Sequence, residues 1–444
     1  MENMYNISNY YIGQELNDAE YLLYSTLTTS MVTIEKDVYE DIFENRFFEK
    51  HPDYCEALEE MGFLFKGGKD FQSKQLESIR KALLEAEHGI TSVTIAPTME
   101  CNARCYYCFE NGAQKGRMTL ETADKAADFL IENCKEKELY ISWFGGEPLM
   151  AVDIIDRING KLVDAGIHVE SNFTTNGILI NDNIIKLLKK WNVIRVQVTI
   201  DAIGEKYNRI KNYTLDIENP FEQVMRNVEL LISNSFNVHL RVNYQIESFE
   251  EVSKTMKYLH NRFGEEDNIY LYSAPIEDPE HRKSMKFSEE EGETFLKTVK
   301  LAADCGYIND EINYRDLKVT DDYYDELGQY MLAPFPANCY MINKDRFVID
   351  DLGILYKCQK HLGRKKYSCG DVFSGPKRNK IYYHYSTEKL KDKKCATCEI
   401  LPICQGGCNA NRLLYGEKFA CPPMKTISKQ LVKAYYDAIR KEED

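Results

Sequence analysis

The chain has 444 residues, of which 43% are hydrophobic and 29% charged, a mixture typical of a folded protein with a sizeable core. Its 56 basic and 71 acidic residues give a net charge of −15, which argues against a nucleic-acid-binding protein. The sequence shows neither the long apolar run of a membrane span nor the basic and apolar start of a secretory signal, so we expect a cytoplasmic protein with no membrane partner.

Residues 1–70 alternate short β-rich stretches with helical ones, a pattern that resembles a small winged-helix module. Residues 66–75 are typical of a turn and linker, and we predict a linker helix at 71–89 from its 3.6-residue apolar period. The helical part of the module is acidic, which weakly favours a basic partner. The alternative is that this module only caps the next domain.

Residues 90–280 repeat a short apolar run followed by a helical segment six times. This order predicts an α/β fold with a parallel sheet and helices outside it. Six units are too few for a closed eight-stranded barrel, so we expect a partial (β/α)6 barrel. In such folds the chemistry lies at the carboxyl ends of the strands.

Fourteen cysteines are many for a reducing compartment, where thiols do not persist as disulfides. Cys55 and Cys134 lie apart from the rest and are typical of small buried side chains. The remainder gather at residues 101–108 and, nine of them, after residue 300. This grouping predicts metal sites.

The first group reads Cys101-Asn-Ala-Arg-Cys105-Tyr-Tyr-Cys108 and follows the first predicted strand of the barrel. A zinc knuckle is one interpretation, but zinc sites usually close with four ligands, and a fourth is not near in the sequence. The other is an iron–sulfur cluster held by three thiolates, with one iron left open for a small molecule.

The CX3CX2C spacing on a βα array resembles the radical S-adenosylmethionine (radical SAM) superfamily. The resemblance implies that Cys101, Cys105 and Cys108 are catalytic and hold a [4Fe–4S] cluster whose open iron binds SAM. Cleavage of SAM would then yield a 5′-deoxyadenosyl radical that removes a hydrogen atom from the substrate.

Further motifs at the strand ends match the family's SAM contacts. The Gly-Gly-Glu-Pro turn would bring backbone close to the methionine part of SAM, with its glutamate accepting from the ammonium group. Hydroxyl and amide groups on later strands suit the ribose and carboxylate, although these could equally be structural. The predicted contacts are Gly145, Gly146, Glu147, Pro148, Thr175, Asn176, Thr199, Asp201, Arg241 and Asn243.

Residues 281–335 are charged and helical and would bridge to a cysteine-rich domain at 336–425, followed by a C-terminal helix at 426–444. The cysteine-rich part reads Cys339-X13-Gly353-X4-Cys358, then Cys395-X2-Cys398-X5-Cys404-X3-Cys408, then Cys421. This order resembles the SPASM domain, which binds auxiliary [4Fe–4S] clusters in a subset of radical SAM enzymes.

The resemblance implies two auxiliary clusters, and therefore three [4Fe–4S] clusters in all. Cys339, Cys358 and Cys408 would hold auxiliary cluster I, and the second would have the ligands Cys395, Cys398, Cys404 and Cys421. Cys369 is either the fourth ligand of cluster I or a plain buried thiol. A zinc ribbon is the alternative for residues 395–408.

SPASM enzymes mostly modify peptides or proteins. Sulfatase maturases of this group usually carry an Asp base directly after the second SPASM cysteine, whereas Gln359 follows Cys358 here. The resemblance therefore favours a peptide maturase that crosslinks a ribosomally made precursor, most often by a cysteine thioether. A sulfatase-type maturase, a carbon–carbon crosslinking maturase and a non-catalytic electron carrier are the alternatives.

Such an enzyme implies two partners. Residues 1–70 would bind the leader of the precursor peptide as an added strand. A flavodoxin or ferredoxin would supply the electron that cleaves SAM.

Overall fold

The computed structural model describes residues 5–443 except 69–70, 73, 79–88, 265, 278–285, 305–338, 340, 342, 387–392, 418–419 and 423. Much of the expected linker helix at 71–89 and most of the bridging segment at 281–335 lie outside the described residues, as does Cys305. In the described part of the chain, every helix is too short or too polar to cross a membrane.

The centre of the molecule is an eight-stranded sheet in the order β11-β10-β9-β8-β7-β6-β12-β13. Its first six strands pair in parallel, which confirms the predicted α/β architecture. These strands are β6 (Ser92–Ile95), β7 (Glu138–Trp143), β8 (His168–Thr175), β9 (Val193–Thr199), β10 (Asn237–Tyr244) and β11 (Ile269–Pro275).

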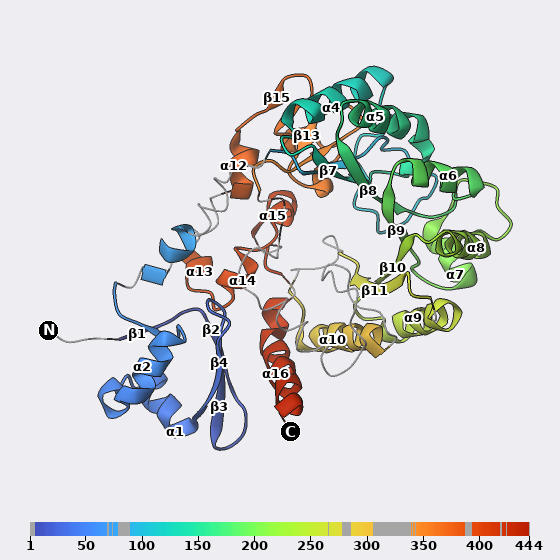
Figure 1. Cartoon of the computed structure of the whole chain (residues 1–444). Coiled ribbons are helices and arrows are strands. Elements are labelled where there is room, and N and C mark those ends of the chain that lie inside the picture. Colours follow the sequence, from blue (N-terminus) through green and yellow to red (C-terminus); the bar gives the residue numbers. More distant parts are fainter. Residues whose placement is uncertain are drawn as a thin grey trace.

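Helices follow the outer side of the curved sheet (Figure 1). Their starts are set by polar caps: the Thr119 side chain accepts from Thr122 N, and that of Asn181 accepts from Asn183 N and Ile184 N. Their apolar faces share one large core with the strands. The helices are α4 (Leu120–Asn133), α5 (Val152–Asp164), α6 (Asp182–Lys190), α7 (Gly204–Lys211), α8 (Pro220–Ser233), α9 (Phe249–Phe263) and α10 (Glu289–Asp304).

Two further strands extend this sheet from the cysteine-rich region, which we had expected to be separate. β12 (Phe347–Ile349) pairs in parallel with β6, and β13 (Leu355–Tyr356) pairs antiparallel with β12. The cysteine-rich region is therefore anchored to the barrel beside the strand that precedes Cys101. Its other elements are β14 (Gly370–Asp371), β15 (Gly375–Pro376), α12 (Lys380–Ser386), α13 (Lys393–Ala396), α14 (Leu401–Cys404), α15 (Asn409–Tyr415) and α16 (Met424–Glu443).

The N-terminal residues form a three-stranded antiparallel sheet with short helices on one side. The elements are β1 (Asn6–Ile7), β2 (Tyr11–Glu15), β3 (Glu20–Ser25), β4 (Met31–Glu35), α1 (Lys36–Tyr39), α2 (Pro52–Glu60) and β5 (Leu64–Phe65). The description of this module as a winged helix stays a prediction.

The N-terminal sheet packs against the C-terminal helix α16, which lies beside it in Figure 1. Ile12 and Leu22 share a buried cluster with Ile403, Ile427 and Leu431. The two ends of the chain therefore form one hydrophobic core.

Candidate active site and cysteine clusters

The first cysteine motif lies in the loop after β6, at the carboxyl end of the sheet. Burial raises the pKa of the Cys101 thiol to about 12, and the nearby Cys105 and Cys108 act in the same direction. The Ala103 amide donates to Cys101 Sγ at 3.4 Å and opposes this shift. Thiols in such surroundings become thiolates when a metal binds them.

These three thiols influence one another but do not converge on a single point. Within the described residues, three or more His, Cys, Asp or Glu side chains are nowhere placed to hold a single metal ion. A four-iron cluster is larger than a single ion and separates its cysteine ligands more widely. The donor set therefore fits a [4Fe–4S] cluster better than zinc.

The Gly-Gly-Glu-Pro turn lies directly against the chain that leads to Cys101. Gly146 N donates to Thr98 O at 3.0 Å, and Glu147 N donates to Glu100 O at 2.8 Å. A Cβ atom on Gly146 would lie 2.0 Å from Glu100 O, so only glycine fits. In the structure these glycines allow the close approach of two protein loops, and their contact with SAM stays a prediction.

Glu147 is fully buried, and protein groups occupy its carboxylate. It accepts from Thr175 Oγ1 at 2.8 Å, Asn176 N at 2.9 Å and Leu149 N at 3.1 Å. Burial outweighs these bonds and raises its pKa to about 7. Glu147 thus holds the loop after β8 and caps the short helix begun by Pro148, and its contact with the SAM ammonium group stays a prediction.

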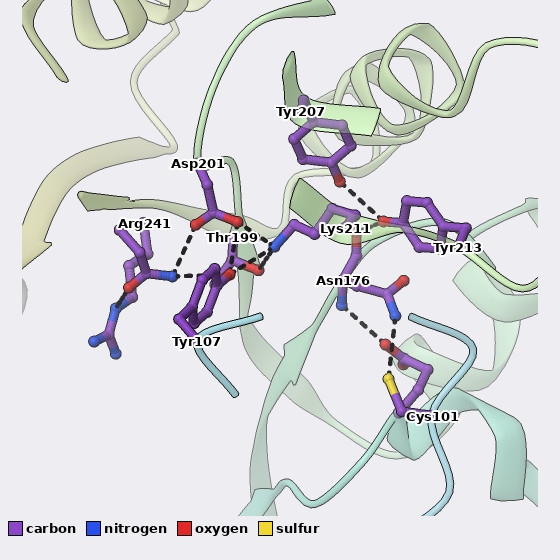
Figure 2. A network of polar contacts seen from close by, with 11 residues as sticks. Cys101, Tyr107, Asn176, Thr199, Asp201, Tyr207, Lys211, Tyr213 and Arg241 are labelled. Atoms are coloured by element: carbon purple, nitrogen blue, oxygen red, sulfur yellow. Dashed lines mark hydrogen bonds and ion pairs between the residues drawn. The ribbon is translucent and has the colours of Figure 1, made fainter. Parts of the chain in front are cut away.

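An ion pair that the sequence did not reveal lies at the end of β9. Lys211 Nζ is 2.6 Å from Asp201 Oδ2, and both side chains are 1% exposed (Figure 2). Lys211 also donates to Thr199 Oγ1 at 2.8 Å and to the Tyr107 hydroxyl at 3.2 Å. Burial disfavours the ammonium, but Asp201 together with Tyr107, Cys105 and Tyr207 outweighs burial and holds the pKa of Lys211 well above its usual value.

The same network reaches the fifth barrel strand. Asn243 Nδ2 donates to Asp201 Oδ1 at 2.9 Å, and Arg241 Nε donates to Asn243 Oδ1 at 2.9 Å. The Tyr107 hydroxyl donates to Asp201 Oδ2 at 2.6 Å (Figure 2). Four of the predicted SAM contacts, at 199, 201, 241 and 243, are therefore brought together in one network with Lys211 and Tyr107.

Helix α7 ends against the cysteine loop. Arg104 N donates to Lys211 O at 2.8 Å, and Thr214 N donates to Asn102 O at 2.8 Å. Asn176 Nδ2 bonds to Asn102 Oδ1 at 2.7 Å and reaches Cys101 Sγ at 4.0 Å. The loop is thus held by main-chain and side-chain bonds along its length.

Sequence reasoning missed Lys211 and Tyr107. Tyr107 could have been noticed because it lies between two cysteines of the motif. Lys211 lies on an ordinary polar helix and carries no motif, so only the fold reveals its position.

The C-terminal cysteines lie in two groups. Group I consists of Cys339, Cys358 and Cys408: burial raises the pKa of Cys358 to about 12, and the other two thiols add to it. Group II consists of Cys395, Cys398, Cys404 and Cys421. Burial is the main cause that raises the pKa of Cys404 to about 12, and the other three thiols of the group add to the shift. These are the two sets that the resemblance to the SPASM domain implied.

Cys369 lies in the hydrophobic core and is fully buried. Its thiol donates to the Leu355 carbonyl at 3.4 Å. Cys369 is thus placed as a buried thiol in this structure, and its ligation of auxiliary cluster I stays a prediction.

A glycine allows the approach of the last cysteine of group II. Gly407 has φ +78°, and a Cβ atom there would lie 1.9 Å from Ala420 O. Cys408 N donates to the same carbonyl at 2.8 Å, which brings groups I and II into one piece of structure.

Residues 95–259 match the family described as the Radical SAM superfamily. The chain is 26% identical over 350 residues to a cysteine-type anaerobic sulfatase-maturating enzyme of Clostridium novyi, covering 72% of this chain and 88% of that protein. It is 22% identical over 419 residues to the radical SAM cyclopropyl synthase TigE of Paramaledivibacter caminithermalis, covering 88% and 82%.

Two solved structures share the fold. Native anSMEcpe with bound AdoMet and Kp18Cys peptide has a TM-score of 0.60 at 20% identity and covers 79% of this chain and 97% of that one. Streptococcus suis SuiB bound to its precursor peptide SuiA has a TM-score of 0.53 at 15% identity and covers 94% and 99%. The family match, with the cysteine loop at the end of β6 and the sheet that carries it, shows that the chain contains a radical SAM domain.

Proposed function

We propose that the chain is a peptide maturase that joins a cysteine sulfur to a carbon within one ribosomally made precursor peptide. Radical SAM enzymes use SAM and a [4Fe–4S] cluster. One relative is named for the maturation of a sulfatase, and SuiB is bound to a precursor peptide. The proposal also assigns auxiliary clusters I and II to groups I and II, and SAM-contacting roles to the predicted residues at the strand ends.

The observation that carries this proposal is the position of group I beside the radical SAM loop. Lys360, two residues after Cys358, is paired with Glu277, which follows β11 at the carboxyl end of the sheet. Arg364 donates to the carbonyls of Phe109 and Asn111, just beyond Cys108. A peptide bound at the carboxyl end of the barrel would therefore lie between the two sites.

Buried hydrogen bonds and ion pairs hold the loops around the cysteine motif in place and keep water away from them. Cys101, Cys105 and Cys108 would hold the cluster that, with SAM, supplies a 5′-deoxyadenosyl radical. The buried bonds around Lys211 and Glu147 fix the loops on either side of it before any ligand binds. Few groups then need to rearrange when SAM and the peptide arrive.

A thioether formed from an S–H and a C–H group removes two hydrogens and two electrons from the peptide. One hydrogen atom leaves with the adenosyl group, the thiol proton goes to solvent, and one electron is left for an acceptor. Group I is suited to hold that acceptor because cluster potentials respond to ligation and hydrogen bonding. The first electron would come from a flavodoxin or ferredoxin.

The test is mass spectrometry of the peptide encoded beside the gene after incubation with enzyme, SAM and dithionite. We expect 5′-deoxyadenosine, and a peptide lighter by two hydrogens with one thiol fewer to alkylate. Cys358→Ala should keep some SAM cleavage and lose the product. A trapped aldehyde would favour sulfatase-type oxidation. A product whose thiols can all still be alkylated would favour a carbon–carbon crosslink. The absence of 5′-deoxyadenosine would favour an electron carrier.

We further propose that the leader peptide adds as a strand to the outer edge of β4. β2 lies against α16, where Gln14 donates to Lys429 O at 2.9 Å, whereas β4 pairs only with β3 in the described part of the sheet. Such an edge offers main-chain donors and acceptors to an extended peptide.

A proline on this edge tests the role. Ser25 N donates to Ser30 O and Lys36 N to Ala19 O, at the two ends of the β3–β4 ladder. Because bonded pairs alternate along an antiparallel ladder, the Thr33 amide points away from β3. Thr33→Pro should weaken binding of the precursor about tenfold or more in a titration, whereas Thr33→Val, which keeps the amide, should not. Equal affinities for the two variants would contradict strand addition.

A further inference from the structure

Tyr385 lies near the end of α12, against group I. Its side chain is 1% exposed and packs in one cluster with Cys339 and Cys358. Its hydroxyl is hydrogen-bonded to the Cys358 side chain. The Lys360 amide, which belongs to the main chain, also bonds to this sulfur. Tyr385 is therefore a side chain through which the surroundings of Cys358 can be altered.

A histidine supports this hydroxyl from behind. His361 is fully buried, its Nε2 is 2.9 Å from the Tyr385 hydroxyl oxygen, and its ring lies 4.5 Å from that of Tyr367. Its Nδ1 is buried and has no hydrogen-bond partner among the described residues.

The unpartnered nitrogen indicates which tautomer is present. A buried N–H without an acceptor is rarer in proteins than a buried acceptor without a donor, so the proton belongs on Nε2. His361 then donates to the Tyr385 oxygen, and the single Tyr385 proton is directed to Cys358.

We propose that Tyr385, supported by His361, is a positioning residue of group I that donates a hydrogen bond to the Cys358 thiolate and raises the reduction potential of the cluster held there. The inference rests on the proposed function in that group I holds a [4Fe–4S] cluster. Reduction adds one electron to the cluster and makes its sulfurs more electron-rich. A donor to one of these sulfurs therefore stabilises the reduced form more than the oxidised form.

The test is a redox titration of the reconstituted enzyme, followed by electron paramagnetic resonance without SAM or peptide. The group I signal is identified as the one that Cys358→Ala removes. Tyr385→Phe removes the hydroxyl and keeps the ring. We expect the equilibrium constant for reduction of the group I cluster to fall about tenfold, which lowers its potential by ~59 mV for a one-electron couple. The iron content should be unchanged. His361→Phe should shift it in the same direction by less.

Tyr383→Phe is the matched control, because Tyr383 lies on the same helix with its side chain exposed, and it should leave the potential unchanged. A Tyr385→Phe enzyme with full iron content and an unshifted group I potential would overturn the inference. A shift in an enzyme that modifies no peptide would support it while the maturase proposal fails. An iron content that accounts for the radical SAM cluster alone would overturn both this inference and the maturase proposal.

Discussion

Lys211 holds a charge where neither it nor its partner reaches water. A buried ion pair is stabilising only as long as both members are present, because the survivor is left uncompensated. Lys211 joins the end of β9 to the cysteine loop, so its loss affects the frame of the site and not only one contact.

Lys211→Met should lower the free energy of unfolding by about 3–5 kcal/mol, measured by urea denaturation, because Asp201 is left buried without its cation. The double variant Lys211→Met with Asp201→Asn removes both charges and should recover part of the loss. A single variant as stable as the wild type would show that the pair contributes nothing to the frame.

Because of Glu147, the free energy of unfolding should fall as the pH rises. Its pKa is raised from 4.5 to about 7 in the folded chain, mainly by burial, so the folded chain holds this proton more tightly than the unfolded one. Its contribution to stability is therefore full below pH 4.5 and is lost as the pH rises through about 7.

Glu147→Gln cannot titrate and should lack this part of the decline. The check is urea unfolding of both proteins from about pH 5 to about pH 8: the slopes should differ below about pH 7 and become parallel above it. Parallel slopes throughout would mean that Glu147 titrates normally.

At the scale of elements, close approaches of the main chain decide where the cysteines lie. Gly407 and Gly416 both have positive φ, +78° and +90°, but a Cβ on Gly407 would collide with Ala420 O while the space around Gly416 is open. Substitutions at the two positions therefore distinguish the effect of backbone strain from that of a steric collision.

Gly407→Ala should displace the segment that carries Cys421 and lower the iron content by about one cluster, in addition to the backbone strain of about 1–2 kcal/mol. Gly416→Ala should show the strain alone and keep its iron. The iron content and the thermal unfolding of both variants are measured. Equal iron contents in the two variants would contradict the role of Gly407.

The elements that sequence predicted well are those with a local signal. Six apolar runs alternating with amphipathic helices defined the parallel sheet, and the spacing of Cys101 to Cys108 placed its site. β12 and β13 were missed because strands of three and two residues carry no period, and the pairing of β12 with β6 joins segments about 250 residues apart. The protein contacts of Glu147 and Lys211 were not predicted because their partners come from other strands and helices.

For the whole molecule, the junction between the chain ends determines how peptide recognition can be tested. Removing residues 1–65 to test peptide recognition would expose Ile403, Ile427 and Leu431, which pack against Ile12 and Leu22. Tyr10 also donates to Ala396 O at 3.0 Å, between two cysteines of group II. A deletion would therefore damage group II as well, and point changes on the outer edge of β4 are the better test.

Ile12→Ala should cost about 2–5 kcal/mol as a large-to-small change in a buried site, and its effect should appear far along the sequence. We expect faster hydrogen exchange in α14 and α16. Leu58→Ala, in the separate core of the N-terminal module, should speed exchange within that module only. The same exchange pattern in both variants would show that the junction does not couple the two ends.

The shared core of the two ends also bears on synthesis. When β3 leaves the ribosome, its apolar partners in α14 and α16 are about 400 residues from being made. At about 5–20 residues per second, the N-terminal sheet waits roughly 20–80 seconds with one apolar face uncovered. The chain is expected to need a chaperone during this interval, and the metal sites near its end can be filled only after the last helix has been released.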